Sequence, residues 1–147
     1  MREMAVLNSA LAAGGKILAA KFGRVGYRLK RRADLLTATS KAGPAGVSST
    51  ADAAGGCDGV KDGNYGFHTT DEDRPWWQVD LGAVTRIDRV VIFNRCNIAT
   101  ERAAHLHLLL SDDAKAWKTV YRHDGQVFLG VRDGKPLVVP LAGAAAR

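Results

Sequence analysis

The 147-residue chain has few cysteines and no long apolar run. Its two cysteines, Cys57 and Cys96, lack the spacing of metal ligands and are too few for a disulfide framework. No run approaches the roughly 18 apolar residues that cross a bilayer. The apolar stretch 4–13 is broken by Gly14-Gly15-Lys16 and has no clear small-x-small cleavage site, so no convincing signal peptide is found and the compartment stays open.

The groups that enzymes need are also missing. Catalysis requires a nucleophile paired with a base, two convergent carboxylates or a metal cluster, and no such set is evident. The acidic run 71–73 is better explained as a solvated loop than as a glycosidase pair, whose members act from opposite sides of a bond. His105 and His107 alternate without a third metal ligand in sight. We therefore expect a non-enzymatic protein.

The positive charge is concentrated in the first part of the chain. Residues 1–41 hold nine Lys and Arg against two acids, a net charge of +7, whereas residues 42–147 hold twelve against thirteen, a net charge of −1. The basic N-terminal segment has two interpretations: a weak contact with an anionic surface, and a solvated linker, which is the simpler one. No nucleic acid is expected as a partner of the later residues.

The chain divides into two parts by pattern. Apolar residues recur at roughly helical spacing between residues 4 and 36, which predicts one or two short helices in a segment spanning residues 1–41. Residues 37–66 are rich in Ala, Gly, Ser and Thr and are typical of a linker that passes into irregular loops. A domain is therefore expected over residues 42–147.

The second part has the pattern of short antiparallel strands. Alternating or β-branched runs separated by turn-forming residues predict an all-β sandwich. The expected strands are 77–81, 86–93, 105–110, 117–122, 127–129 and 136–141. Trp77 shares one strand face with Val79 and Leu81, which favours a place in the core over a sugar-stacking surface.

Several motifs in this part resemble those of a known family. Asp62-Gly63-Asn64, the run Pro-Trp-Trp-Gln-Val-Asp-Leu-Gly at 75–82, the strand 87–95, and Ser111-Asp112-Asp113 followed by Trp117 are similar to successive signatures of the discoidin family, also called the coagulation-factor type C family. The resemblance covers about residues 45–147. It implies a jelly-roll β-sandwich of the galactose-binding-domain type that binds ligands through loops at one end.

His68, Arg95 and Arg102 are the sharpest candidate site. Their spacings of 27 and 7 residues resemble the fucose-binding motif of the F-type lectins, a branch of the same fold in which a His and two Arg converge on the sugar. Guanidinium groups provide rigid forks of donors, and an imidazole provides one further hydrogen bond to sugar hydroxyls. The other interpretation is that both arginines pair with nearby acids and His68 is an ordinary loop residue.

The residues around this motif affect its specificity. Tyr65, Phe67 and Ile98 are the nearest candidates for an apolar surface under the methyl group of a 6-deoxy sugar. Asn97 stands where the F-type motif has Asp, and Ile98 begins the pair that stands where many F-type lectins have adjacent cysteines. Glu101 is a candidate replacement for the missing carboxylate. These departures place fucose specificity in doubt, so a monosaccharide of fucose or galactose type is expected.

The discoidin resemblance also implies a structural Ca²⁺. Asp62 and Asn64 match the family pattern and offer hard oxygen ligands, while an Asx turn explains the same residues equally well. The C-terminal run 137–147 resembles the approach to a final strand, so we expect that the domain lacks this strand and has an open edge suited to a homo-oligomer.

Three functions remain open at this point. The first is a lectin-like module that binds a glycan or monosaccharide. The second is a protein- or phospholipid-binding discoidin module. The third is an accessory domain whose ligand site has decayed.

Overall fold

The structure of the chain is a computed structural model that describes residues 3–10, 16–18, 37–40, 49–69 and 75–147. Within these residues strands predominate over short helical segments, and no helix is long and apolar enough to cross a membrane. The elements in chain order are β1 (Glu3–Ala10), β2 (Lys16–Leu18), β3 (Thr37–Ser40), α2 (Ser49–Ala53), η1 (Ala54–Gly56), β4 (Phe67–His68), β5 (Trp76–Asp80), β6 (Thr85–Asn94), η2 (Thr100–Ala103), β7 (His107–Leu110), β8 (Lys118–Arg122) and β9 (Leu137–Ala146).

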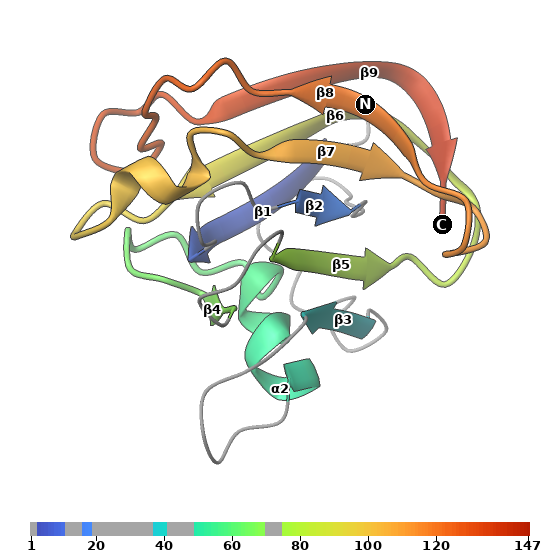
Figure 1. Ribbon diagram of the computed structural model, residues 1–147, viewed down its shortest axis with the longest axis horizontal. Helices are drawn as coiled ribbons and strands as arrows, with labels where there is room; N and C mark the ends of the chain where they lie inside the picture. Colours follow the sequence, from blue (N-terminus) through green and yellow to red (C-terminus); the bar gives the residue numbers. More distant parts are fainter. Residues whose placement is uncertain (1–2, 11–15, 19–36, 41–48, 70–74) are drawn as a thin grey trace.

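The described strands form two sheets that pack face to face (Figure 1). One sheet has the order β4-β1-β6-β9 and the other has the order β3-β5-β2-β7-β8. Strand β1 runs parallel to both of its neighbours, whereas β9 runs antiparallel to β6 and β8 runs antiparallel to β7. The predicted all-β sandwich is confirmed.

The hydrophobic core lies between the two sheets. Alternate residues of β5 are buried, and Trp77 and Val79 point inward as their spacing predicts. The indole of Trp77 is fully buried and stacks on the ring of Phe67, with 5.5 Å between the ring centroids. The opposing sheet contributes apolar side chains from β6 and β9 to the same cluster, among them Ile87, Val90, Ile92 and Val139.

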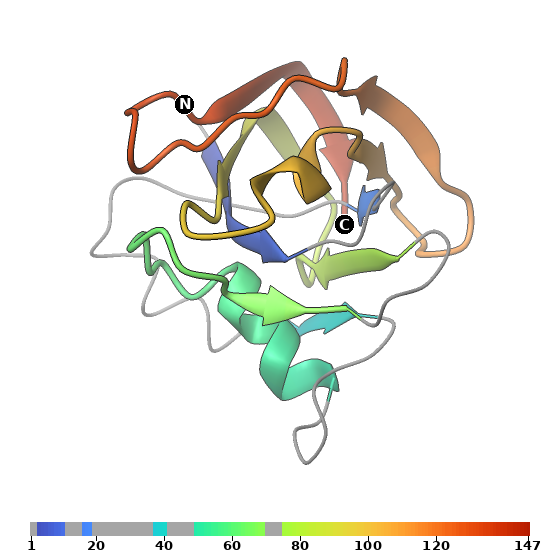
Figure 2. The same cartoon turned by 60° about the vertical axis from the view of Figure 1, so that its left-hand side comes forward.

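The short helical segment α2–η1 lies beside β3 and β4 (Figure 2). It falls within the stretch that the sequence predicts to be linker and loop. The carbonyl of Ala53 accepts a hydrogen bond of 2.8 Å from Nε1 of Trp77. A Cβ at Gly56 would lie only 2.7 Å from the same indole, so a residue without a side chain is needed there. The helical segment is thereby fixed to the core.

The helices predicted between residues 4 and 36 are wrong for the described part of that segment, which forms β1 and β2. Pairing of these residues with strands far along the chain overrides a local periodicity that several glycines already weaken. The basic cluster Lys21 to Arg32 lies outside the described residues. Its contact with anionic surfaces stays a prediction, as does the division of the chain between residues 41 and 42.

The C-terminal run forms a longer strand than expected. Strand β9 continues through Ala146 and pairs with β6, with a register shift opposite the Ile87–Arg89 step of that strand. Ala142 and Gly143 have φ angles of 51° and 80° at this shift, which is typical of a β-bulge. The bulge lets the alanine-rich end rejoin β6.

Candidate functional site

Three loops meet at the end of the sandwich where β6 and β8 finish and β7 and β9 begin (Figure 1). They span residues 57–66, 95–106 and 123–136. The backbone N–H of Cys96 donates to the carbonyl of Gly63 at 2.7 Å and joins the first two loops. The N–H of Gly125 donates to the carbonyl of Ala104 at 3.0 Å and joins the second and third. The three loops thus form one continuous surface, which we call the loop end.

Asn94, the last residue of β6, connects two loops of the loop end. Its side chain is fully buried, and its amide nitrogen donates to the carbonyls of Thr100 at 2.7 Å and Phe128 at 2.9 Å. Its side-chain oxygen accepts a hydrogen bond of 2.9 Å from the backbone N–H of Arg95. The backbone N–H of Asn94 donates to the carbonyl of Leu129. Residues 127–129, predicted to be a strand, are therefore held as an irregular segment by one asparagine.

Tyr65 is the aromatic residue at the centre of the candidate site. Its side chain is about half exposed, at 48%. The ring of His68 lies 4.4 Å from the Tyr65 ring, centroid to centroid, and the guanidinium carbon of Arg95 lies 5.3 Å from the same centroid. The structure therefore brings three of the predicted site residues into contact, from the loop 57–66 and from the ends of β4 and β6.

Arg95 is nearly buried, with 7% exposure, and its Nε donates to the side-chain oxygen of Asn97 at 2.8 Å. The same oxygen accepts a hydrogen bond from the backbone N–H of Ile98 at 2.8 Å. Asn97 therefore takes over the arginine-holding role for which Glu101 was the candidate, and Glu101 is exposed. Among the described residues, the hydrogen-bond partner and the ring partner of the Arg95 side chain, Asn97 and Tyr65, are both neutral.

His68 has a partner that the sequence did not single out. Nδ1 of its ring lies 2.9 Å from Oδ1 of Asp52, and its backbone N–H donates to Oδ2 of Asp52 at 2.6 Å. The Asp52 side chain is 10% exposed and the His68 side chain 38%. The one available signal was composition, because Asp52 is the only acid between Asp34 and Asp58 in a stretch of small residues.

The remaining candidates fall into different positions. Ile98 is 66% exposed on the loop end. Arg102 is also exposed, and within the described residues no contact joins its side chain to His68, Tyr65 or Arg95. Phe67 is fully buried against Trp77, so its place in an apolar ligand surface is corrected to a place in the core.

Asp62 and Asn64 form the Asx turn that was the alternative to a calcium site. Oδ1 of Asp62 accepts the backbone N–H of Asn64 and Oδ2 accepts the side-chain amide, each at 2.8 Å. These bonds, the side-chain one first, lower the pKa of Asp62. The described residues contain no group of three or more His, Cys, Asp or Glu that can hold a metal ion. The two residues thus satisfy each other, and calcium binding stays a prediction.

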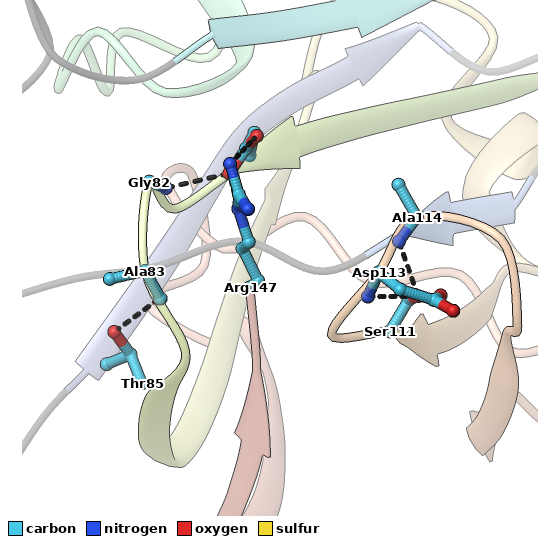
Figure 3. Close-up of polar contacts among 8 residues, drawn as sticks. Gly82, Ala83, Thr85, Ser111, Asp113, Ala114 and Arg147 are labelled. Carbon is cyan, nitrogen blue, oxygen red and sulfur yellow. Dashed lines mark hydrogen bonds and ion pairs between the residues drawn. The ribbon is translucent and has the colours of Figure 1, made fainter.

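The opposite end of the sandwich has polar groups that bond mainly to one another (Figure 3). The backbone N–H of Gly82 and the side chain of Arg147 both donate to Asp80, and they lower the pKa of this carboxyl in that order of importance. Ser111 exchanges hydrogen bonds with the turn at Asp113. A shallow depression of about 410 Å³ beside Ser111 is lined largely by small and apolar residues. Among the described residues, the large aromatic side chain that is about half exposed, Tyr65, lies at the loop end and not here.

Comparison with known proteins places the chain in a family. A family model described as NedA-like, galactose-binding domain matches residues 57–130, a span that includes Tyr65, His68, Arg95 and Asn97 but not Asp52. No curated protein and no solved structure matches the chain. Domains of this family are typically non-catalytic binding modules. Because the match covers half of the chain, the protein belongs to the NedA-like galactose-binding domains, a family of the discoidin type.

Proposed function

We propose that the protein is a non-enzymatic carbohydrate-binding module that takes a monosaccharide unit of fucose or galactose type on the loop end. The observation that carries the proposal is the half-exposed ring of Tyr65 in contact with both His68 and Arg95. An aromatic face suits the C–H face of a sugar ring, and the two flanking side chains supply hydrogen bonds to its hydroxyls. Asp52 and Asn97 orient these two side chains.

The state of Arg95 supports a polar ligand. A guanidinium carries five N–H donors, and although Arg95 is nearly buried, none of its nitrogens is a fully buried group without a partner, so its free donors remain accessible to a ligand. Within the described residues the Nε–H is taken by the neutral oxygen of Asn97, and no carboxylate pairs with the terminal nitrogens. A sugar hydroxyl or ring oxygen at the loop end would accept hydrogen bonds from these remaining donors.

The proposal is tested by titrating L-fucose and D-galactose against the native protein, Arg95→Ala and Tyr65→Ala, by calorimetry or ligand-observed NMR. Loss of a charged hydrogen bond is worth about 1.5–3 kcal/mol, so the Kd should rise at least about tenfold in Arg95→Ala. Tyr65→Ala is the second variant because its side chain is exposed and its loss should leave the fold intact.

Arg86→Ala is the matched control, since Arg86 is an exposed arginine near the start of β6, at the other end of the sandwich. Its affinity should equal that of the native protein. Saturable binding that survives Arg95→Ala and Tyr65→Ala would place the sugar elsewhere. Failure of the native protein to bind any sugar, with its circular dichroism spectrum intact, would overturn the proposal and favour a decayed ligand site.

A second candidate function is binding to a phospholipid or protein surface. Three apolar side chains, Val60, Ile98 and Val127, are each at least half exposed, and they lie on the three different loops of the loop end. Apolar residues at loop tips suit insertion into an interface. Sedimentation with phosphatidylserine vesicles tests this candidate: binding that Ile98→Ser abolishes, without any sugar binding, would favour it over the carbohydrate module.

A further inference from the structure

We infer that Asp52 fixes the tautomer of His68 so that Nε2 of its ring presents a hydrogen-bond acceptor at the loop end, which selects neutral hydroxylated ligands over acidic ones. The inference rests on the proposed carbohydrate site, whose ligand class it narrows. Asp52 is a positioning residue in this account, because it acts through His68.

The geometry determines where the proton lies. A carboxylate only accepts hydrogen bonds, and both Asp52 oxygens face nitrogens of His68: Oδ2 accepts from the backbone N–H at 2.6 Å, and Oδ1 lies 2.9 Å from Nδ1. Nδ1 must therefore carry a hydrogen. In the neutral imidazole Nε2 then has a free lone pair and acts as an acceptor.

The carboxylate is held firmly enough to play this role. Asp52 lies in α2, and the next residue, Ala53, is fully buried and accepts the hydrogen bond from the Trp77 indole. The Asp52 side chain is largely shielded from solvent, whereas more than a third of the His68 side chain is exposed beside Tyr65. A largely shielded, fixed acceptor thus orients a more exposed ring.

The pairing of an acceptor with a donor defines the ligand class. Arg95 offers hydrogen-bond donors next to the Tyr65 ring, and Nε2 of His68 offers an acceptor next to the same tyrosine ring. A hydroxyl can donate to one group and accept from the other, so a neutral sugar satisfies both. At Nε2 a ligand carboxylate or phosphate oxygen, which has only lone pairs, would face another lone pair, so an acidic group gains from Arg95 but not from His68, whereas a hydroxyl gains from both.

The test compares the native protein with Asp52→Asn. An asparagine side chain has one oxygen and one NH₂ group. The backbone N–H of His68 can only donate and takes the oxygen, so the NH₂ group faces Nδ1, which must then accept. The hydrogen should move to Nε2, converting the exposed acceptor into a donor.

Two measurements follow on the full chain at neutral pH. Long-range ¹H–¹⁵N spectra of the imidazoles, with the His68 signals identified by their loss in His68→Gln, should show hydrogen on Nδ1 in the native protein and on Nε2 in Asp52→Asn. Binding of L-fucose, D-galactose and D-galacturonate should then show that the preference for the tighter neutral sugar over galacturonate falls about tenfold in Asp52→Asn.

Asp124→Asn is the matched control because it removes the same charge from the loop end. Its side-chain oxygen can keep accepting the N–H of Gln126, and it leaves His68 untouched. The preference should be unchanged in this variant, which separates the tautomer from a simple change of net charge.

Hydrogen on Nε2 of native His68 would overturn the inference without any variant. The expected tautomers with an unchanged preference in Asp52→Asn would overturn the selection of neutral ligands. If no sugar binds the native protein, the proposed function fails and the selection fails with it, while the ligand-free spectra still decide whether Asp52 sets the tautomer.

Discussion

Replacing Asn94 with alanine should destabilise the protein more than any other single polar substitution at the loop end. The change removes three side-chain hydrogen bonds at a fully buried position and leaves the carbonyls of Thr100 and Phe128 and the N–H of Arg95 without these partners. Each buried group left unsatisfied costs about 1–3 kcal/mol, part of which water entering the cavity would offset. The expected loss is about 3–5 kcal/mol, a large share of a typical unfolding free energy of roughly 5–15 kcal/mol.

Urea unfolding followed by tryptophan fluorescence, to which the buried Trp77 contributes, measures this loss, and the melting temperature should fall by about 10 °C. Asn94→Asp should be at least as harmful, because it places a carboxylate oxygen against two carbonyls. Gln126→Ala, at an exposed amide on the same loops, should change stability by less than about 0.5 kcal/mol. A loss below about 1 kcal/mol in Asn94→Ala would refute the reasoning that one asparagine holds the loops together.

Three further predictions concern other groups. Burial, together with the charge of Asp58, raises the pKa of the Cys57 thiol from 9.0 to about 11. The folded state therefore favours the neutral thiol. This contribution to stability is complete below pH 9, and about 3 kcal/mol is lost as the pH rises through 11. Urea titrations between pH 8 and 11 should show this slope in the native protein and a smaller one in Cys57→Ala. If calcium binds at Asp62, adding CaCl₂ should raise the melting temperature of the native protein but not of Asp62→Ala. An unchanged melting temperature in both proteins would leave the Asx turn as the role of Asp62. Gly56→Ala should lower the melting temperature and red-shift tryptophan emission, since its Cβ would enter the space of the Trp77 indole.

The sequence predicted the strands whose burial in the sheet is visible in their own residue pattern. The alternation in β5 was sufficient because burial of one face imposes a period of two. Strand β6 has three consecutive buried residues, and its β-branched composition predicted it instead. Residues 127–129 have a strand-like composition, but the buried side chain of Asn94 takes the carbonyl of Phe128, and its backbone N–H takes the carbonyl of Leu129. Such a contact spans 34 positions and leaves no periodic signal.

The candidate site was predictable in part for a related reason. The resemblance to the F-type lectin motif pointed to His68 and Arg95, and Tyr65 was a candidate for the apolar surface beside them; the structure brings the three into contact. Spacing did not reveal that Phe67 is buried, since neighbouring residues in a strand face opposite ways. Asp52 was missed because its role depends on a helix meeting β4 in space.

Strand β1 has a consequence for how the molecule assembles. In the described sheet β4 pairs with β1 alone, so the strand that carries His68 joins the sheet through residues near the start of the chain. The first pair between β1 and β6 joins Glu3 to Arg89, 86 positions later. During synthesis β1 cannot pair with β6 until most of the chain has been made, and closure of such long loops makes folding slow. A fragment trimmed to the family-matched span 57–130 would contain neither β1 nor β9, and His68 would lose the strand that anchors it.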